Sequence, residues 1–533
     1  MMNKNIKKNT EILVGFGTCG IAAGSKDIFN IIKNIIKNNV HLKKTGCIGL
    51  CYCEPNIEII IDNKTFLYGN VTTNNVITIL KEFDLCKKNV LLKKEYNENP
   101  KLIKKDWYYP ELEENHHNVK QARIVLKNIG RIDPENIQDY ISNNGYEALK
   151  KVLLSMKPKD VISQIQGSML RGRGGGGFPT GTKWKLASEQ QSDIKYVICN
   201  ADEGNPGAFM DRAILEGDPH SVIEGMIIAG YAINANHGYI YIRAEYPLAI
   251  ERLNIAIKQA SKIGLIGTNI LGTNYNFNLK LNYGAGSFVC GEETALINSI
   301  SGKRGIPISK PPYPAVEGLN KKPTVINNVE TLANICPIIR NGSNWYKKIG
   351  TPSSTGTKVF SLTKRAKKTG LVEVPMGTTL NDIIYDLGDG VEDNLKLKAI
   401  QIGGPSGNFI TTKNMKIPMD YESLTSIGST IGTGGIIVIS QEDSIVNIVK
   451  SFMDFAVKES CGKCVPCRIG SVHLLNILNK ITDRNATIED IVTLEELSFM
   501  IKKTSFCGFG STMTENVLSS IKHFKKEYIN YIK

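Results

Sequence analysis

The chain has 533 residues, of which 41% are hydrophobic and 22% charged, and its formal net charge at pH 7 is +14. This length exceeds what one hydrophobic core usually supports, so we expect several domains. No stretch resembles a membrane-spanning helix, the basic start lacks signal or transit features, and the lysine excess is not interleaved with aromatic residues, which favours a cytoplasmic protein without membrane insertion or a nucleic-acid partner.

The N-terminal part of the sequence predicts a small α/β unit followed by a linker. In residues 1–86, a short strand precedes a helical stripe of isoleucines after Gly24, and two strand-like segments and a helix follow. Residues 87–118 are polar and rich in Lys and Asn, which predicts the linker.

The rest of the chain predicts three further domains. Residues 119–350 alternate Gly-rich turns with apolar strands and helical stretches, which predicts α/β layering. Residues 351–440 hold short strands around one helix and predict a small β-rich domain, while four helical segments in residues 441–533 predict a helical bundle. The fold class is therefore a multidomain protein with α/β and α parts.

Four cysteines near the C-terminus have the spacing of a metal centre. Cys461, Cys464 and Cys467 form a C-x2-C-x2-C run, and Cys507 follows later in the chain. Three thiolates at this spacing can cap one face of a 4Fe–4S cluster, and Cys507 is the obvious fourth donor. A zinc site held by the same residues is the alternative, but zinc ligands usually arrive as two separated C-x2-C pairs.

The densest glycine cluster is RGRGGGGFPTGTKW, residues 171–184. Glycines allow positive φ and let backbone N–H groups approach an anion closely, and Lys183 can add a charge to phosphate. The segment lacks the acidic residue that follows an ordinary Rossmann fingerprint, so we do not expect that motif.

Four polar segments follow this glycine loop. Residues 200–212 place two acidic groups at the end of an apolar strand. These groups could accept hydrogen bonds from ribose hydroxyls or a flavin, or they could lie in a solvated loop. Residues 284–294 enter a helix whose N-terminus favours anions. Residues 310–314 present a cation and an aromatic ring on a stiff loop, and residues 327–331 place amide and hydroxyl groups before a helix.

Seven motifs in order carry a family resemblance: LRGRGGGGFPTGTKW, CNADEGNPGAFMDR, YIRAEYP, GAGSFVCGEETALINS, KPPYPAVEGL, KPTVINNVET and SCGKCVPCR. Together they resemble the NADH-binding flavoprotein subunit of respiratory complex I. They resemble still more the related subunits of cytoplasmic NAD-linked hydrogenases, including electron-bifurcating ones, and of NAD-linked formate dehydrogenases. The resemblance covers about residues 120–533.

The resemblance implies a role for each matching residue. It assigns the loop that cradles FMN to Gly172, Arg173, Gly174 and Lys183, and flavin contacts to Asn200, Asp202, Glu203 and Gly204. It assigns the FMN phosphate to Asn327, Asn328 and Thr331, NADH stacking to Phe178 and Tyr313, and dinucleotide contacts to Glu293 and Lys310. The same motifs add Gly175, Gly291, Glu292 and Ile326 to the cofactor-binding residues. It assigns the 4Fe–4S ligands to Cys461, Cys464, Cys467 and Cys507.

The sequence departs from the family pattern at three positions. Asn205 replaces an acidic residue, Phe288 replaces a tyrosine, and Ile308 stands where a basic residue is expected. These changes leave the preference for NADH over NADPH open.

The N-terminal unit resembles the thioredoxin-like 2Fe–2S ferredoxin domain that is fused to hydrogenase-type subunits. Cys19, Cys47 and Cys51 are in place, but Gly24 stands where a fourth cysteine is expected. Cys53 is the candidate fourth ligand of a 2Fe–2S cluster, and a domain without a cluster is the alternative. Residues 356–440 resemble the family's ubiquitin-like, or β-grasp, domain.

The resemblance implies an NADH dehydrogenase subunit that moves hydride between NAD(H) and FMN and passes single electrons through iron–sulfur clusters. The flavin would carry the chemistry, and no side chain is needed as a general acid or base. The expected partners are a hydrogenase catalytic subunit and a thioredoxin-like 2Fe–2S subunit, with complex I or formate dehydrogenase as alternatives. A non-catalytic Fe–S scaffold subunit and a zinc-stabilised nucleotide-binding protein are the rivals from other classes.

Overall fold

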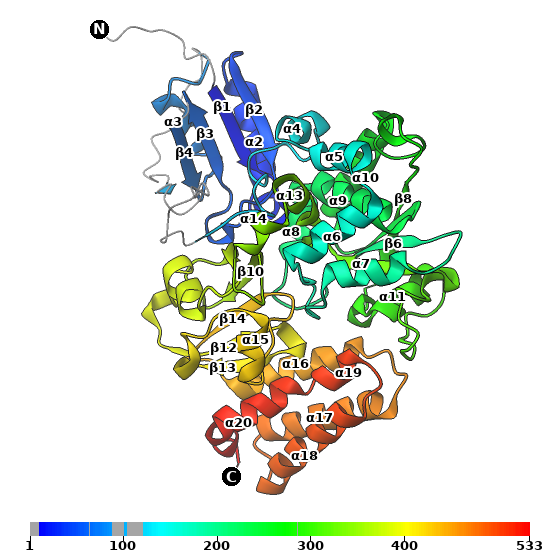
Figure 1. Ribbon diagram of the computed structural model, residues 1–533. Helices are drawn as coiled ribbons and strands as arrows, with labels where there is room; N and C mark the ends of the chain where they lie inside the picture. The colour runs from blue at the N-terminus through cyan, green and yellow to red at the C-terminus, as the bar shows by residue number, and fades with distance from the viewer. Residues whose placement is uncertain (1–9, 63, 88–100, 104–120, 285, 533) are drawn as a thin grey trace.

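The computed structural model describes residues 10–62, 64–87, 101–103, 121–284 and 286–532. It contains three separate sheets and a helical C-terminal region, so the predicted division into α/β and α parts is confirmed. The N-terminal unit lies at the upper left of Figure 1, the large α/β domain at the upper right, and the C-terminal helices at the bottom. Within the described residues, no helix is long and apolar enough to cross a membrane.

The N-terminal unit is a five-stranded sheet in the order β2-β1-β3-β4-β5. Strands β1 and β2 are parallel, and the other pairs are antiparallel. The predicted isoleucine stripe forms one face of helix α2, where Ile28 and Ile32 are buried. The elements are β1 (Thr10–Gly15), α1 (Thr18–Ala22), α2 (Ser25–Ile35), β2 (Val40–Thr45), η1 (Cys51–Cys53), β3 (Ile57–Ile61), β4 (Lys64–Gly69), α3 (Val76–Glu82) and β5 (Lys101–Ile103).

Strand β5 lies inside the segment that the sequence predicts as a linker, residues 87–118. Its three residues pair with β4 at the edge of the sheet. A strand this short has too few residues to show an alternating pattern in the sequence. Residues 88–100 and 104–118 of the predicted linker lie outside the described residues.

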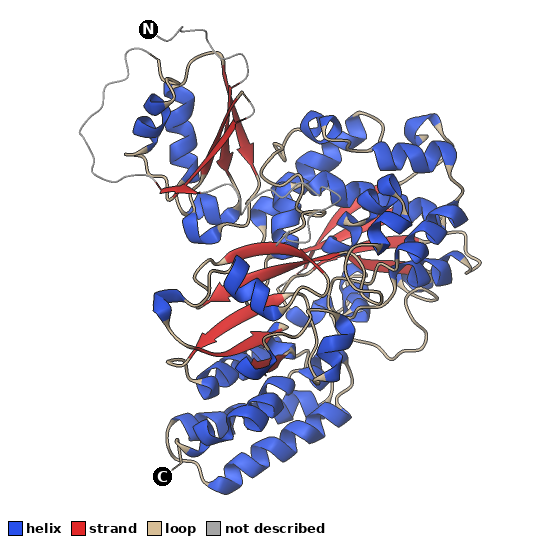
Figure 2. Cartoon of the chain, turned by 60° about the vertical axis from the view of Figure 1, so that its left-hand side comes forward, coloured by secondary structure: helices blue, strands red, loops and turns tan. Residues whose placement is uncertain are grey.

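The large α/β domain is built on a four-stranded sheet in the order β8-β7-β6-β9, with every pair parallel. Helix α9 is buried along nearly its whole length, and Figure 2 shows helices packed around these strands. The strands are β6 (Tyr196–Ala201), β7 (His237–Arg243), β8 (Asn278–Gly284) and β9 (Thr324–Asn328). The longer helices are α4 (Ile137–Ser142), α5 (Glu147–Ser155), α6 (Pro158–Ser168), α7 (Thr180–Ser188), α8 (Met210–Gly217), α9 (Pro219–Ile233), α10 (Pro247–Lys262), α11 (Glu293–Ile300) and α13 (Ile335–Asn341). The shorter ones are η3 (Ile270–Gly272), η4 (Phe288–Gly291), η5 (Leu319–Lys321), α12 (Val329–Ala333) and α14 (Ser343–Lys347).

The β-rich region has a mixed sheet in the order β11-β10-β14-β12-β13. The central pair β10–β14 is parallel, and the other pairs are antiparallel. Its elements are β10 (Thr357–Lys364), β11 (Gly370–Pro375), the π-helix η6 (Asp382–Leu387), η7 (Glu392–Asn394), β12 (Leu397–Ile402), η8 (Gly404–Ser406), β13 (Asn408–Thr411), η9 (Thr412–Asn414), α15 (Tyr421–Ser426) and β14 (Gly435–Ser440).

The C-terminal region is helical, as the periodicity predicts. Side-chain caps define where two of its helices begin: Ser444 accepts from the N–H of Asn447, and Thr487 forms a capping box with Asp490. Its helices are α16 (Ile445–Glu459), α17 (Val465–Thr482), α18 (Ile488–Thr504), α19 (Gly508–Thr512) and α20 (Glu515–Ile529).

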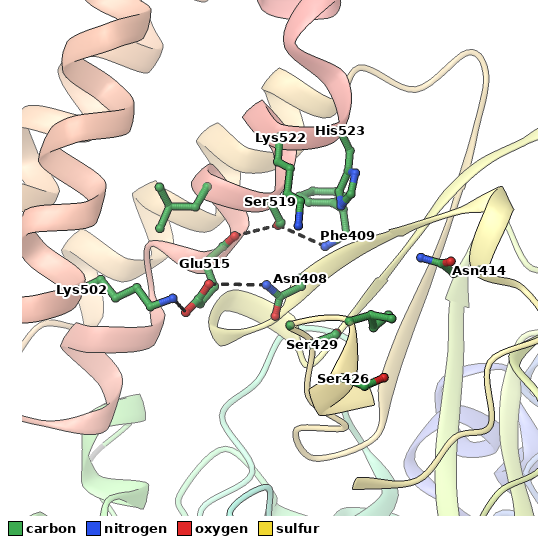
Figure 3. A pocket seen from close by; sticks show the side chains of 13 residues that line it. Asn408, Phe409, Asn414, Ser426, Ser429, Lys502, Glu515, Ser519, Lys522 and His523 are labelled. Carbon is green, nitrogen blue, oxygen red and sulfur yellow. Dashed lines mark hydrogen bonds and ion pairs between the residues drawn. The ribbon is translucent and has the colours of Figure 1, made fainter. Parts of the chain in front are cut away.

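A cavity of about 580 Å³ lies between β13, the segment after α15, and helices α18 and α20 (Figure 3). Glu515 lines this cavity, and its carboxylate lies 2.6 Å from the Lys502 ammonium and 3.5 Å from the Asn408 amide. The cavity is lined by residues outside the seven motifs, so it is distinct from the predicted cofactor site.

Candidate functional site

The predicted cofactor residues gather at one edge of the parallel sheet. Because all four strands run in the same direction, their carboxyl ends meet at this edge. Asn200 lies near the end of β6 and Asn328 at the end of β9, and these two residues are register partners in neighbouring strands. Motifs that are far apart in the sequence are therefore brought together here.

The glycine loop precedes α7 and is closed at its base by backbone hydrogen bonds. The N–H of Gly172 donates to the carbonyl of Phe178 at 2.9 Å. Gly175 and Gly177 have φ angles of +113° and +60°, which glycine adopts with little strain. A Cβ atom on Gly174 would lie 2.9 Å from Cβ of Asn328, so the loop backbone is held close against the end of β9.

Two of the predicted cofactor residues, Arg173 and Thr331, hold the glycine loop in place. Arg173 is only 1% exposed, and its guanidinium donates to the carbonyls of Thr355 and Thr357 at 2.6 and 3.0 Å. The backbone N–H of Arg173 donates to the hydroxyl of buried Thr331 at 2.8 Å. The Arg173 guanidinium therefore fastens the loop to the start of β10, and the Thr331 hydroxyl fastens it to α12.

A group of opposite charges lies beside the loop. The Lys183 ammonium is 2.6 Å from the Glu293 carboxylate and 3.0 Å from the carbonyl of Ile326. Lys310 is 2.8 Å from Glu292 and 3.6 Å from Glu293. Burial raises the pKa of Glu293, but the two lysines outweigh this effect and hold it below its usual value. The predicted dinucleotide contacts thus form one connected, ionised network.

Asp202 follows β6 as a buried carboxylate with an unused oxygen. Its N–H donates to Asn200 Oδ1 at 3.1 Å, while Asn200 Nδ2 donates to the carbonyl of Gly291 at 2.9 Å. Within the described residues, Asp202 Oδ2 and Asn205 Oδ1 are buried without a hydrogen-bond partner. Such atoms are rare in folded proteins, so their presence fits a ligand with hydrogen-bond donors.

Glu203 anchors the loop after β6 to helix α8. Its carboxylate accepts from the N–H groups of Asp211 and Arg212, each at 3.0 Å. A Cβ atom on neighbouring Gly204 would lie 2.7 Å from Phe288, so glycine is required for this close approach. Burial raises the pKa of Glu203.

The side chains of the two asparagines at the end of β9 also make hydrogen bonds within the protein. Asn327 is buried and accepts from the Trp184 indole at 2.9 Å. Asn328 caps α12 and donates to the Asp211 carboxylate at 2.5 Å, but its side chain is only half-buried. Asn328 is therefore the member of this pair that remains accessible to a ligand.

Two aromatic rings and one apolar side chain are exposed near these motifs. Phe178 is 49% exposed and Tyr313 is 60% exposed, and both lie on loops. Ile308, one of the departures from the family pattern, is 49% exposed. The predicted stacking residues therefore have free ring faces.

The four C-terminal cysteines come from the beginnings of two helices. Cys461, Cys464 and Cys467 lie at the start of α17, and Cys507 is the N-cap of α19. Burial is the main cause that raises the pKa of Cys467 to about 11; the Ser460 hydroxyl opposes it, and the charges of the other three thiols add to it. The four sulfur atoms thus lie within electrostatic range of one another.

Within the described residues, no three His, Cys, Asp or Glu side chains converge as the ligands of a single metal ion do. The thiolates of an iron–sulfur cubane are bound to different irons, so they need not converge on one point.

Three of the four N-terminal cysteines come together, and the fourth does not. The Cys51 thiol hydrogen-bonds with Cys19 and Cys47, and this contact is the main cause that lowers the pKa of Cys19 to about 6. Arg212 of α8 contributes by donating to Cys19 Sγ at 3.8 Å. Cys53 is 1% exposed and directs its thiol to the carbonyl of Leu50 at 3.4 Å.

Glu54 is a residue of this N-terminal site that the sequence reasoning missed. Its Oε1 atom lies 3.9 Å from Cys47 Sγ. The only signal in the sequence is its position directly after the Cys51-Tyr-Cys53 run.

Asp202 gives a testable dependence of stability on pH. Burial raises its pKa from 3.8 to about 7, so the folded chain binds more protons than the unfolded chain between these values. Stability should therefore fall as the pH rises from about 4 to 7, by on the order of 4 kcal/mol from this group. The Asp202→Asn variant should lack this loss in urea unfolding of the flavin-free chain.

The control for this experiment is Asp454→Asn, which changes a carboxylate on the surface of α16. Its curve of stability against pH should run parallel to that of the wild type. A parallel curve for Asp202→Asn would contradict the assignment.

Comparison with known proteins identifies two matched family regions. Residues 165–337 match the family described as Nuo51 FMN-binding domain, and residues 447–531 match the NADH-ubiquinone oxidoreductase-F iron-sulfur binding region. The chain is 53% identical over 409 residues to the NADP-reducing hydrogenase subunit HndC of Solidesulfovibrio fructosivorans, covering 77% of this chain and 83% of that protein. It is 42% identical over 397 residues to the F subunit of NADH-quinone oxidoreductase from Escherichia coli (strain K12), covering 74% and 89%.

A solved NAD+-reducing [NiFe]-hydrogenase in the H2-reduced state has a similar structure. It matches with a TM-score of 0.70 and 27% identity, covering 99% of this chain and 85% of that one. These findings confirm the resemblance carried by the seven motifs. The chain therefore belongs to the family that contains the F subunit of NADH-quinone oxidoreductase and the HndC subunit of NADP-reducing hydrogenase.

Proposed function

We propose that this chain is the flavoprotein subunit of a redox complex that moves hydride between NAD(H) and FMN. Electrons then leave singly through a 4Fe–4S cluster. The observation that carries this proposal is the edge of the parallel sheet, where the glycine loop packs against Asn328 and the Asp202 carboxylate retains an unused oxygen. The family match over residues 165–337 supports FMN as the ligand.

The residues at this edge fit FMN. The backbone N–H groups of Gly174 and Gly175 can approach its phosphate, and Lys183 supplies a positive charge next to the loop. Asn200, Asp202 and Gly204 offer polar atoms and close backbone approach for the ring. When bound, FMN supplies the conversion between two-electron and one-electron transfer.

The NAD(H) position is supported by the exposed rings. Phe178 and Tyr313 offer free aromatic faces for stacking. The network of Lys310, Glu292 and Glu293 supplies hydrogen-bonding groups for the dinucleotide. These side chains would bind NAD(H) and orient it toward the flavin. Proximity of the nicotinamide and flavin rings would then supply much of the rate of hydride transfer.

Cys461, Cys464, Cys467 and Cys507 would hold the 4Fe–4S cluster. Four thiols at two helix N-termini provide the donor set, and the match over residues 447–531 supports an iron–sulfur region. Iron analysis of the purified chain tests this against a zinc site.

We propose a specific fold for two of the domains and residue boundaries for all four. The sheet order β2-β1-β3-β4 with a parallel first pair supports a thioredoxin-like fold for residues 1–86. A central parallel pair flanked by antiparallel strands supports a β-grasp fold for residues 351–440. Residues 119–350 would be the cofactor domain and residues 441–533 the cluster-binding bundle.

The proposed complex is an NAD-linked or electron-bifurcating hydrogenase. Its catalytic subunit and a thioredoxin-like 2Fe–2S subunit would be the partners. The 53% identity to HndC and the similarity to NAD+-reducing hydrogenase support this choice over complex I or formate dehydrogenase. The subunits that co-purify with the chain would test it, and a cytoplasmic location stays a prediction.

The Lys183→Ala variant tests the FMN site. It removes the ammonium beside the loop, and loss of a charged hydrogen bond of about 1.5–3 kcal/mol should weaken FMN binding roughly 10- to 100-fold. The measurement is the ratio of flavin absorbance to protein after dialysis. Lys185→Ala is the matched control, because Lys185 lies on the same helix with its side chain 55% exposed. Equal flavin content in both variants would count against the site, and a wild-type chain that binds no flavin would favour a scaffold subunit.

A further inference from the structure

We propose that Glu54 acts with Cys19, Cys47 and Cys51 as the fourth ligand of a 2Fe–2S cluster in the N-terminal domain. The carboxylate takes the place of the thiol that is absent at position 24. This inference rests on the proposed function, because it assumes that the N-terminal domain carries a cluster.

The three thiols form the core of this site. Cys19 lies in α1, Cys47 in the loop after β2, and Cys51 at the start of η1. The loop before α1 lies against Cys47, since a Cβ atom on Gly17 would lie 2.5 Å from Cβ of Cys47, and the Cys51 thiol interacts with Cys19 and Cys47. Three elements of the fold therefore each deliver one sulfur to the same place, and Arg212 of α8 approaches Cys19 with a positive charge.

Position 24 cannot contribute a ligand. Gly24 is the N-cap of α2 with a φ angle of +107°, which side-chain-bearing residues rarely adopt. A Cβ atom built there has nothing within 4 Å, so the residue sits beside open space.

Cys53 is positioned for the core rather than for the cluster. Its thiol donates to the carbonyl of Leu50 within the η1 turn. It packs in a small buried cluster with Ile48, Leu50 and Leu67. The Cys53 sulfur is therefore buried in this cluster, apart from the thiols of Cys19, Cys47 and Cys51.

Glu54 has the geometry that Cys53 lacks. Its Oε1 lies 3.9 Å from Cys47 Sγ, and its Oε2 is buried without a hydrogen-bond partner within the described residues. Oε2 lies 3.0 Å from the place that a Cβ on Gly20 would take, and the buried Ser25 hydroxyl, also unpartnered, lies 2.8 Å from the same place. A buried carboxylate with an unused oxygen is unfavourable unless it takes up a proton or binds a cation, so this oxygen is available to a metal.

The chemistry of the donor set is consistent with iron. Non-thiolate ligands occur in two-iron clusters, as the imidazoles of Rieske centres show, and they change the properties of the iron that they bind. Carboxylate is an anionic oxygen donor, so it preserves the charge that a fourth thiolate would provide. An oxygen ligand should therefore give this cluster a different electron paramagnetic resonance (EPR) signal from an all-cysteine cluster.

The test uses the full chain, reconstituted anaerobically with iron and sulfide and then reduced with dithionite. Iron is counted per chain, and EPR is recorded at temperatures where only the two-iron signal is sharp. The wild type should hold about six irons, four in the cubane and two in the N-terminal domain. Glu54→Gln, which keeps the shape of the side chain, should hold about four irons and lose the two-iron signal.

Two further variants complete the design. Cys53→Ala is the matched control and should keep both the iron and the wild-type signal. Glu54→Cys places a thiol at the ligand position and should give a two-iron signal with altered g values. This variant tests the proposal even if Glu54→Gln does not fold.

Several results would overturn the proposal. A Glu54→Gln or Glu54→Cys signal identical to that of the wild type would show that residue 54 is not a ligand. Loss of the signal in Cys53→Ala would assign the fourth position to Cys53, and a wild type with only the cubane would show a domain without a cluster. Failure of the proposed function would appear separately, as a wild-type chain without FMN or without the 4Fe–4S signal.

Discussion

Replacing Lys358 with methionine should lower the free energy of unfolding by about 3–5 kcal/mol. Lys358 on β10 and Glu330 on α12 form an ion pair in which the side chains are 0% and 1% exposed. Glu330 also accepts from the N–H of Val359 at 2.9 Å, and its own N–H donates to buried Asp211. Without the lysine, two neighbouring buried carboxylates lose their shared positive charge.

The measurement is the urea midpoint followed by tryptophan fluorescence, since Trp184 and Trp345 lie in the domain that contains Glu330. The double variant Lys358→Met/Glu330→Gln should recover much of the loss, because neither partner is then left as an unpaired charge. Lys364→Met is the control on the same strand, where the lysine side chain is 34% exposed, and it should change stability by about 1 kcal/mol or less. A loss in Lys358→Met no larger than this control would contradict the interpretation.

Replacing Cys507 with serine should remove about four iron atoms per chain, because a cubane needs four thiolates. Cys507 is the N-cap of α19 and is not among the residues predicted to hold FMN, so FMN content should stay unchanged. NADH should still bleach the flavin, while electron transfer to the partner subunits should stop. Iron analysis and stopped-flow absorbance measure the two effects on one preparation.

Cys86→Ala is the control, because this buried cysteine packs in the N-terminal core. It should keep all its iron. A Cys507→Ser chain with full iron content would exclude this residue as a ligand, and stoichiometric zinc in the wild type would favour the zinc site.

The class of fold and the family could be predicted from the sequence because the informative chemistry is local. The glycine loop needs positive φ at Gly175 and Gly177, and glycine at these positions is visible in the sequence alone. The C-x2-C-x2-C run likewise fixes three cysteines at the start of one helix. In both places, neighbours in the sequence are also neighbours in the site.

The direction of a side chain could not be predicted where distant segments decide it. Arg173 is turned away from the edge of the sheet by the carbonyls of Thr355 and Thr357, which belong to another part of the chain. Cys53 and Glu54 are adjacent, yet the η1 turn directs one into the core and the other toward the thiols. The spacing of residues in the sequence gives their order, but it does not give the direction in which each side chain points.

Helix α8 joins the two ends of this arrangement. Glu203 holds its first turn, and Glu216 near its end accepts from the backbone N–H of Thr18, next to Cys19, at 2.9 Å. Its eight residues span about 12 Å. Arg212, in the first turn that Glu203 holds, also donates to Cys19 Sγ at 3.8 Å, so both ends of this helix reach the N-terminal cysteine site. Because electron tunnelling weakens exponentially with separation, a connection this direct would favour exchange between the flavin edge and the N-terminal sulfurs.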